Sequence, residues 1–290
     1  MTGLVVVNYN DYRNTIDFIN SIKNYNIIDK IIIVDNCSTD NSFINLKRIV
    51  NDKIVLLKNS SNKGYGSGIN IGSKYMIDNF GIKNIIVSNT DIIIKSENDI
   101  VKMIKYLKDD VALVGPNVLE NGGVNRGWKI PSVWDDVLLN IPIIHRKLRK
   151  KLLFYNDLCF KGKTTVVEAL SGCFFIIRAD ALHSVGFYDE NIFLYYEENV
   201  IGTKLKNNNY KSLIINDVNV IHNHSVTIDN SMNRIRKFKE LKKSQKYFHK
   251  NYSSKSLFGI ISLGITEKIM LVLLYLVVFF KGGKKWRVLF

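Results

Sequence analysis

Cysteine and acidic residues are both scarce in this chain of 290 residues. The three cysteines, Cys37, Cys159 and Cys173, are an odd number without metal-ligand spacing, which argues against a disulfide framework and fits reduced thiols. Asp and Glu number 26 against 41 Lys and Arg, so the formal net charge is +15. This imbalance indicates an anionic partner, of which nucleic acid, a phospholipid surface and a phosphorylated substrate are the candidates.

The sequence also shows neither an export signal nor an internal repeat. The first apolar run, Leu4 to Val7, is too short for a signal peptide and has no basic lead-in. No internal repeat or low-complexity tract is present. We therefore expect the catalytic part in the cytoplasm, as one large domain or as a domain with an appendage.

A bilayer-length apolar run without charges is absent as well. The uninterrupted run Ile269 to Phe280 has twelve residues, fewer than the ~20 that span a bilayer. Counted from Leu257 the run is long enough, but Glu267 and Lys268 interrupt it near the middle. Residues 234–255 before it carry nine Lys or Arg and one acid. We expect residues 229–290 to lie as a basic, then apolar helical segment on the cytoplasmic membrane leaflet; a buried core helix is the alternative.

Short apolar runs alternate with amphipathic segments in the first 115 residues. We expect buried strands at 4–7, 30–34, 54–57, 85–87 and 111–114, with helices between them. This alternation predicts an α/β fold with a mostly parallel sheet and helices on both faces. Polar clusters follow three of these strands, and the carboxyl ends of parallel strands meet at one edge, where ligands bind. After Pro116 the pattern lapses, and we interpret residues 116–165, with the basic run 145–151, as an insertion at the rim of the site on the acceptor side.

Three further patterns are typical of metal-binding or catalytic sites. Asn89-Thr90-Asp91 breaks an apolar run at a strand end, so Asp91 is interpreted as a ligand of a divalent metal that holds a nucleotide diphosphate; an Asp that caps the next turn is the plainer alternative. Glu197 and Glu198 begin a helix after an aromatic-rich approach, although acids are common dipole partners in a first turn. His222 and His224 share one face of a strand, which suits either a structural role or a metal site.

Taken together, these clusters resemble the family 2 glycosyltransferases of the GT-A fold, and most closely their rhamnosyltransferase-like branch. The resemblance covers about residues 4–225 and rests on six or more motifs in the family's order. The motifs are Val7-Asn8-Tyr9-Asn10, Val34 to Asp40, Asn62 to Gly72, Asn89-Thr90-Asp91, Ser171-Gly172, Gly186 to Glu190, Phe193 to Glu198, and His222 with Ser225. The resemblance implies a catalytic GT-A domain over residues 1–228.

The resemblance also implies roles for single residues. The residues expected to bind the nucleotide sugar are Asn8, Asn10, Asp35, Asn36, Ser38, Lys63, Gly64, Asn70, Asn89 and Thr90. The expected ligands of the metal, Mg²⁺ or Mn²⁺, are Asp91, His222 and His224, and the residues expected to contact the acceptor are Trp128, Ser171, Gly172 and Tyr196. The candidates for the catalytic base are Glu198 and Glu197.

The chain departs from the family's pattern at two of these motifs. Asn89 replaces the first Asp of the Asp-x-Asp motif, so His222 or the substrate diphosphate must complete the metal's ligands. Glu198 replaces the Asp that is the base in the family, which leaves the choice between Glu197 and Glu198 open. Inverting transfer needs one base for the acceptor hydroxyl and a cation for the departing diphosphate.

The sequence therefore predicts a metal-dependent, inverting glycosyltransferase of the hexosyl type. We expect it to move a sugar from dTDP-rhamnose or a UDP-sugar to a lipid-linked saccharide in surface polysaccharide synthesis, as a peripheral protein of the inner membrane face. A dinucleotide-binding oxidoreductase is disfavoured, because Gly64 to Gly68 follows the third strand with the wrong spacing. The second alternative is an anion-binding module for membrane or nucleic acid with a degenerate GT-A domain, but no nucleic-acid motif is present.

Overall fold

The computed structural model describes residues 1–223, 234–253 and 256–280. Within them a ten-stranded sheet has the order β3-β2-β1-β4-β9-β6-β10-β5, with β7 beside β6 and β8 beside β10. The strands are β1 (Thr2–Asn8), β2 (Lys30–Asp35), β3 (Ile54–Lys58), β4 (Asn84–Ser88), β5 (Ile92–Ile94), β6 (Val111–Glu120), β7 (Gly123–Asn125), β8 (Thr164–Val167), β9 (Phe174–Arg178) and β10 (Lys211–His222).

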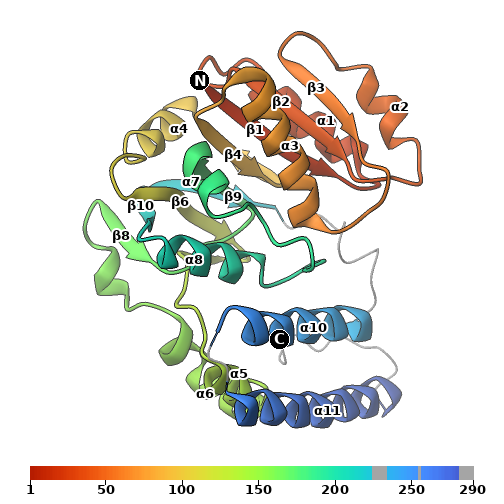
Figure 1. Cartoon of the computed structure of the whole chain (residues 1–290), viewed down its shortest axis with the longest axis vertical. Helices are drawn as coiled ribbons and strands as arrows, with labels where there is room; N and C mark the ends of the chain where they lie inside the picture. Colours follow the sequence, from red (N-terminus) through yellow and green to blue (C-terminus); the bar gives the residue numbers. More distant parts are fainter. Residues whose placement is uncertain (224–233, 254–255, 281–290) are drawn as a thin grey trace.

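Helices follow most of these strands. They are α1 (Tyr12–Ile22), α2 (Ser42–Lys47), α3 (Tyr65–Phe80), α4 (Glu97–Ile104), α5 (Val133–Leu139), α6 (Pro142–Leu153), the 3-10 helix η1 (Asp157–Phe160), α7 (Ala179–Ser184), α8 (Glu197–Asn207), α10 (Arg234–Asn251) and α11 (Leu257–Phe280). Figure 1 shows α5, α6, α10 and α11 gathered on one side of the sheet-containing body.

The sheet is mixed, and six of its ten strands run in one direction, which is the parallel part that the sequence predicted. β3, β2, β1 and β4 pair in parallel, and so do β6 and β10. β9 runs the other way between β4 and β6, so β4 and β6 point in the same direction. The short strand β5 is antiparallel to β10 at the edge. Because β9 is reversed, its amino end, rather than its carboxyl end, lies beside the carboxyl end of β4.

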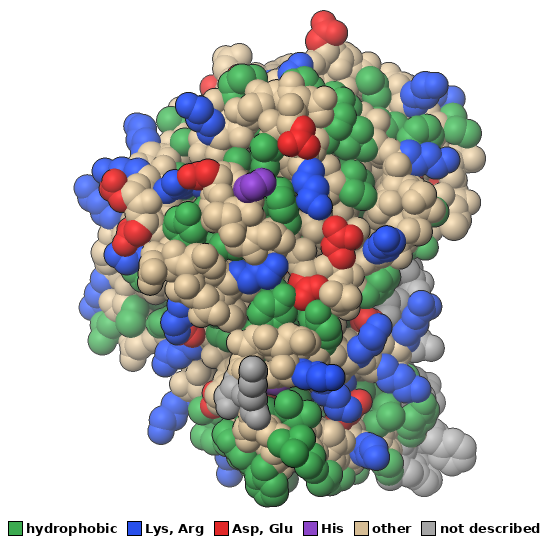
Figure 2. All heavy atoms as spheres, in the orientation of Figure 1, with side chains coloured by type: hydrophobic (Ala, Val, Ile, Leu, Met, Phe, Trp, Pro, Cys, Tyr) green, Lys and Arg blue, Asp and Glu red, His purple; other side chains and the backbone are tan. Residues whose placement is uncertain are grey.

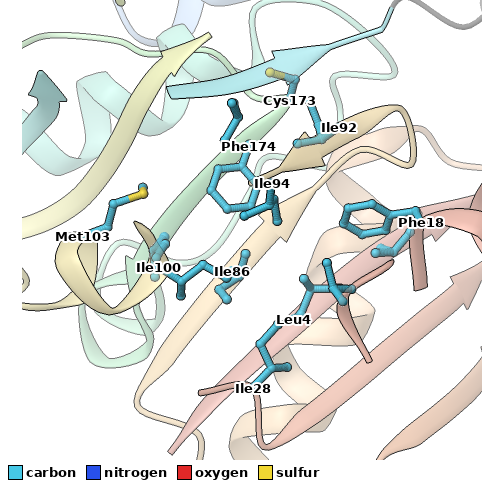
Figure 3. Packing of buried hydrophobic residues seen from close by; sticks show 14 of the residues in the cluster. Leu4, Phe18, Ile28, Ile86, Ile92, Ile94, Ile100, Met103, Cys173 and Phe174 are labelled. Atoms are coloured by element: carbon cyan, nitrogen blue, oxygen red, sulfur yellow. The ribbon is translucent and has the colours of Figure 1, made fainter. Parts of the chain in front are cut away.

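Both faces of the sheet are covered by helices. Alternate side chains of β1 belong to different cores, since Leu4 and Val6 pack with α1, α2 and α4, whereas Val5 packs with α3, α7 and α8. This division follows from the period of two along a strand. Figure 3 shows Leu4 and Phe18 within the first of these cores. Because both faces are covered, the polar segments that could bind a ligand lie mainly at the strand ends.

Several elements extend beyond their expected bounds. β6 continues through Pro116 to Glu120 and pairs with β10, and the strand that carries His222 begins at Lys211. Regular structure therefore continues past the point where the apolar pattern lapses. His224 of the expected strand lies outside the described residues. All three cysteines are free thiols, as expected.

The C-terminal helix α11 packs on one side and is exposed on the other. Leu263, Met270 and Leu274 are buried, Met270 and Leu274 against Phe238 of α10, and Glu267 forms an ion pair with Lys246. Within the described residues, α11 is the one helix long and apolar enough to cross a membrane. Its packed side carries the charge that interrupts the apolar run, so the helix is neither wholly buried nor uniformly apolar.

Candidate functional site

The reversed strand β9 and the edge strand β5 bring three polar segments to one place. The backbone N–H of Asn89, after β4, donates to the carbonyl of Cys173, just before β9, at 2.8 Å. Ile92 of β5 is paired with His222 at the end of β10, and the N–H of Asn223 donates to the carbonyl of Asp91 at 2.9 Å. Segments more than 80 residues apart in sequence thus meet at the carboxyl edge of the sheet.

The first cluster of residues that were predicted to bind the nucleotide is a hydrogen-bond network that joins the loops after β1 and β2. Asn8 Nδ2 donates to Asp35 Oδ2 and to Ser38 Oγ, each at 3.1 Å. The N–H of Ser38 donates to Asp35 Oδ1 at 2.9 Å, and the N–H of Asn10 donates to Ser38 Oγ at 2.9 Å. Asp35 is fully buried. Its carboxylate therefore organises these two loops, while Asn10 remains exposed beside them.

The second cluster of residues that were predicted to bind the nucleotide surrounds the start of α3. Asn36 is buried, and its Nδ2 donates to Asn62 Oδ1 at 3.0 Å and to the Gly64 carbonyl at 3.1 Å. Gly64 has φ +102°, and a Cβ there would lie 2.2 Å from the carbonyl oxygen of Phe193, so only glycine fits. Lys63 is exposed on the same loop. The loop therefore stands against the segment that leads to α8.

Asn70 of α3 bonds to the segment that precedes α8. Its Nδ2 donates to the carbonyl of Tyr188 and to Glu190 Oε1, both at 3.0 Å, and its Oδ1 accepts from the Tyr188 N–H at 2.9 Å. Asn70 is buried. Its amide is therefore committed to anchoring the 186–196 segment on α3.

Asp91 and His222 form the donor pair that could hold a metal. Asp91 Oδ1 and His222 Nε2 are 3.3 Å apart, and two neighbouring ligands of an octahedral ion at about 2.1 Å stand roughly 3 Å apart. Carboxylate and imidazole therefore fit two positions on Mg²⁺ or Mn²⁺. Among the described residues no group of three or more His, Cys, Asp or Glu could hold a metal ion, so further ligands must come from a substrate or from water.

Glu120 completes the surroundings of His222 and was missed by the sequence analysis. His222 Nδ1 lies 3.0 Å from Glu120 Oε2. Burial alone lowers the pKa of His222, but the contacts with Asp91 and Glu120 outweigh it and raise the pKa to about 9. Without a metal the imidazole is thus held as a cation between two carboxylates, and a metal on Nε2 requires the loss of that proton.

Glu197 and Glu198 begin α8 directly after two residues in the left-handed conformation, Tyr195 (φ +71°) and Tyr196 (φ +70°). Burial, followed by the neighbouring Glu198, raises the pKa of Glu197 to about 8. Burial also raises the pKa of Glu198, whose Oε1 accepts from the Gly172 N–H at 3.3 Å. Two adjacent carboxyls in a dry site, with pKa values moved toward neutrality, are suited to proton transfer.

A cavity of ≈ 570 Å³ is lined by Glu197, Glu198 and His222, whereas Asp91 and the clusters around Asp35 and Asn36 do not line it. Eight residues named from the sequence line it, namely Asn89, Trp128, Ser171, Gly172, Tyr196, Glu197, Glu198 and His222. The lining also includes residues of α5, α6, α10 and α11. The predicted acceptor residues and the predicted base therefore share one cavity, and the C-terminal helices form part of its wall.

Helix α10 fixes the segment that leads into α8. Ser244 Oγ donates to the Leu194 carbonyl at 2.8 Å, and Gln245 Nε2 donates to the Tyr196 hydroxyl at 2.9 Å. Tyr196 in turn donates to buried Asp136, whose Oδ2 lies 2.6 Å from His249 Nε2. No sequence pattern marked these partners, because each pair joins residues at least 49 positions apart.

Known proteins resemble this chain in sequence and in fold. Residues 4–186 match the family model described as glycosyl transferase family 2. The low-salt glycan biosynthesis hexosyltransferase Agl10 of Haloferax volcanii is 21% identical over 225 residues, which are 77% of this chain and 67% of that protein.

Two solved structures show the same fold at low identity. The mannosyltransferase PcManGT of Pyrobaculum calidifontis, in complex with GDP-Man and Mn²⁺, has a TM-score of 0.56 and 12% identity over 97% of this chain and 81% of its own. Residues 1–349 of S. aureus TarS, in complex with UDP-GlcNAc, have a TM-score of 0.57 and 14% identity over 98% of this chain and 74% of that chain. The fold is the GT-A fold that the sequence resemblance implied.

The raised pKa of Glu197 predicts a pH-dependent stability. Between pH 4.5 and about 8 the native state keeps a proton on Glu197 that the unfolded state has released. The free energy of unfolding should therefore fall as the pH rises through this window, by up to about 1.4 kcal/mol per pH unit. Glu197→Gln should flatten this slope in urea unfolding of the metal-free chain between pH 5 and 9. Glu190→Gln, at an exposed position, is the control and should keep the wild-type slope; an unchanged slope in Glu197→Gln would refute the assignment.

Proposed function

The chain belongs to glycosyl transferase family 2, and we propose that it is a metal-dependent, inverting hexosyltransferase whose acceptor is a lipid-linked saccharide. The single observation that carries this proposal is the cavity in which Glu198, Gly172 and His222 meet at the carboxyl edge of the sheet. A member of this family acts on nucleotide-sugar donors. dTDP-rhamnose and UDP-sugars are the donors that we favour.

Each side chain of the site has a distinct task in this reaction. Glu198, held by the Gly172 N–H, accepts the proton of the acceptor hydroxyl as that oxygen attacks the anomeric carbon from the face opposite the leaving group. Asp91 and His222 would hold Mg²⁺ or Mn²⁺. When bound, the ion neutralises charge on the departing diphosphate. The loops around Asn8, Asp35 and Asn36 shape the rim on which the nucleoside lies.

The outer face of α11 supports a peripheral position on the cytoplasmic face of the membrane. Phe258, Ile261, Ile265 and Ile269 are all at least 51% exposed and recur every three or four residues, so they form one stripe of the helix. Figure 2 shows hydrophobic side chains together at this end of the molecule, with Lys and Arg side chains beside them. A helix that lies in the interface keeps its contacts with α5 and α10, whereas a spanning helix would lose them.

The alternative is an anion-binding module with a degenerate GT-A domain. A thermal-shift screen of nucleotide sugars with Mn²⁺ separates the two, because a bound donor raises the apparent stability by mass action. A transferase should be stabilised by one nucleotide sugar over the others. Stabilisation by every polyanion alike, and by no nucleotide sugar in particular, would favour the module.

Removal of the metal ligand Asp91 should abolish the effect of Mn²⁺ on donor binding. In calorimetric titration of the preferred nucleotide, Mn²⁺ should raise the affinity of the wild type at least about tenfold and that of Asp91→Ala by less than twofold. Asp217→Ala, which removes an exposed carboxylate paired with Lys102, is the matched control and should behave as the wild type. Equal Mn²⁺ effects in Asp91→Ala and the wild type would remove Asp91 from the metal site.

Gly172 should be essential for the position of the base rather than for the fold. A Cβ at this position would lie 2.7 Å from Glu198 Oε1, so Gly172→Ala must displace the carboxyl group. We expect kcat to fall at least about tenfold, with the KM for the donor unchanged. Glu198→Gln should lower kcat by about 10²–10⁴-fold.

Gly162→Ala is the matched control for this prediction, because the nearest atom to its Cβ is the Thr164 carbonyl oxygen at 3.7 Å. It should retain the wild-type kcat. Full activity of Gly172→Ala or of Glu198→Gln would show that Glu198 is not the base.

The apolar stripe of α11 should carry vesicle binding. Ile265→Asp together with Ile269→Asp should weaken cosedimentation with vesicles of anionic phospholipid by at least tenfold, since burial of each isoleucine contributes about 1.5–3 kcal/mol. Ile44→Asp, at another exposed isoleucine on α2, should leave binding unchanged. Equal loss in both proteins, or in neither, would exclude α11 as the membrane contact.

A further inference from the structure

One wall of the cavity carries positive charge. His145 and Arg149 of α6 and Lys242 of α10 all line it. Lys242 is only 6% exposed, and its ammonium group donates to Asn140 Oδ1 and, at 3.0 Å, to Gln245 Oε1. Both acceptors are neutral amides. A buried ammonium group whose hydrogen-bond acceptors are neutral is costly unless an anion joins them.

Arg149 and Lys242 are two cations beside a histidine whose protonation they oppose. Burial lowers the pKa of His145, and the charges of Arg149 and Lys242 lower it further. Burial lowers the pKa of Lys242 to about 8, although Asp136 and Glu267 act in the opposite direction. The wall therefore holds crowded positive charge, and an anionic group placed among these side chains would relieve the repulsion.

Charge and polarity change along the cavity. Glu197 and Glu198 stand where α8 begins, and Lys242 is linked toward them by Gln245, whose Nε2 donates to the Tyr196 hydroxyl. Leu139, Leu241 and Met270 supply apolar lining from α5, α10 and α11. Figure 1 shows α10 between α8 and α11. Along this wall the two glutamates are therefore followed by the cationic side chains and then by α11, the helix whose outer face is apolar.

We propose that His145, Arg149 and Lys242 form a subsite for the phosphate group of a phospholipid-type acceptor, a saccharide linked through phosphate to a lipid chain. The sugar hydroxyl then faces Glu198, the phosphate lies among His145, Arg149 and Lys242, and the lipid chain leaves along α11. This inference rests on the proposed transfer reaction and names the acceptor's chemical class. The donor diphosphate lies instead beside Asp91 and His222.

Binding of a short lipid phosphate to the full-length chain tests this subsite. The probes are farnesyl phosphate, farnesol and inorganic phosphate, titrated calorimetrically below the micellar concentration of the lipids. Because Lys242 is buried, the primary variant is Arg149→Gln at an exposed position, with Lys242→Met as the second. Arg146→Gln is the matched control, since Arg146 is an exposed arginine on the same helix that does not line the cavity.

The wild type should bind farnesyl phosphate at least tenfold more tightly than farnesol or inorganic phosphate. Arg149→Gln should weaken that binding about tenfold or more, the loss expected for one charged hydrogen bond, and Arg146→Gln by less than twofold. If the two arginine variants weaken binding equally, general surface charge explains the binding and the subsite is refuted. If farnesol binds as tightly as farnesyl phosphate, the cavity is an apolar groove without a phosphate subsite. If inorganic phosphate binds as tightly as farnesyl phosphate, the lipid chain contributes nothing and the acceptor class is wrong.

A measurement of donor binding distinguishes failure of the phosphate subsite from failure of the proposed function. Arg149→Gln should show the wild-type thermal shift with the preferred nucleotide sugar and Mn²⁺, and a lost shift would assign Arg149 to the donor instead. If that sugar stabilises the wild type but farnesyl phosphate does not bind, the subsite is wrong and the transferase stands. If no nucleotide sugar stabilises the wild type, the proposed function fails, whatever farnesyl phosphate does.

Discussion

The common direction of β1, β2, β4, β6 and β10 is the constraint on which the site depends. Helices bury both faces of this sheet, so its strands are mostly apolar. The polar segments that form the site follow strand ends, and the common strand direction collects those ends at one edge. The reversed strand β9 adds Gly172 to the same edge through its amino end. The cleft is thus a direct consequence of which way each strand runs.

The catalytic segment itself is strained and is held from outside the sheet. Tyr195 and Tyr196 both have positive φ, and such residues cost of order 1 kcal/mol or more each. Hydrogen bonds from Ser244 and Gln245 of α10 fix this segment, and Asp136 of α5 accepts from Tyr196. The geometry that brings two glutamates together in a dry site therefore depends on helices far along the chain. The raised pKa of the pair is a result of that enforced burial.

Sequence patterns predicted the part of the fold that depends on local periodicity. The strand at Ile85 to Val87 and the polar break at Asp91 follow from apolar runs. The meeting of Asp91 with His222 was expected only from the family resemblance, and it depends on the antiparallel pairing of β5 with β10. The direction of β9 could not be read, because Phe174 to Ile177 is equally apolar in either direction.

Glu120 was missed for a different reason, since Pro116 appeared to end the strand that carries Glu120. Proline removes one N–H donor, yet β6 continues through it. The partners of Tyr196 were missed because no periodicity relates a residue of α8 to one of α5 or α10. Contacts of that kind follow from how the helices pack in space, which depends on the whole chain.

The family match ends at residue 186, just before the segment that carries Glu197 and Glu198, the proposed catalytic pair. The matched part contains the loops around Asn8, Asp35 and Asp91, which are the features expected of a site for a nucleotide diphosphate. The part beyond it supplies Glu198, the cationic Lys242 and the apolar stripe of α11. The cavity crosses this boundary, because α5 and α6 belong to the matched part whereas α8, α10 and α11 lie beyond it. Helix α10 bonds to the segment that leads into α8 on one side and packs on α11 on the other, so it connects the glutamate end of the cavity with the C-terminal helix.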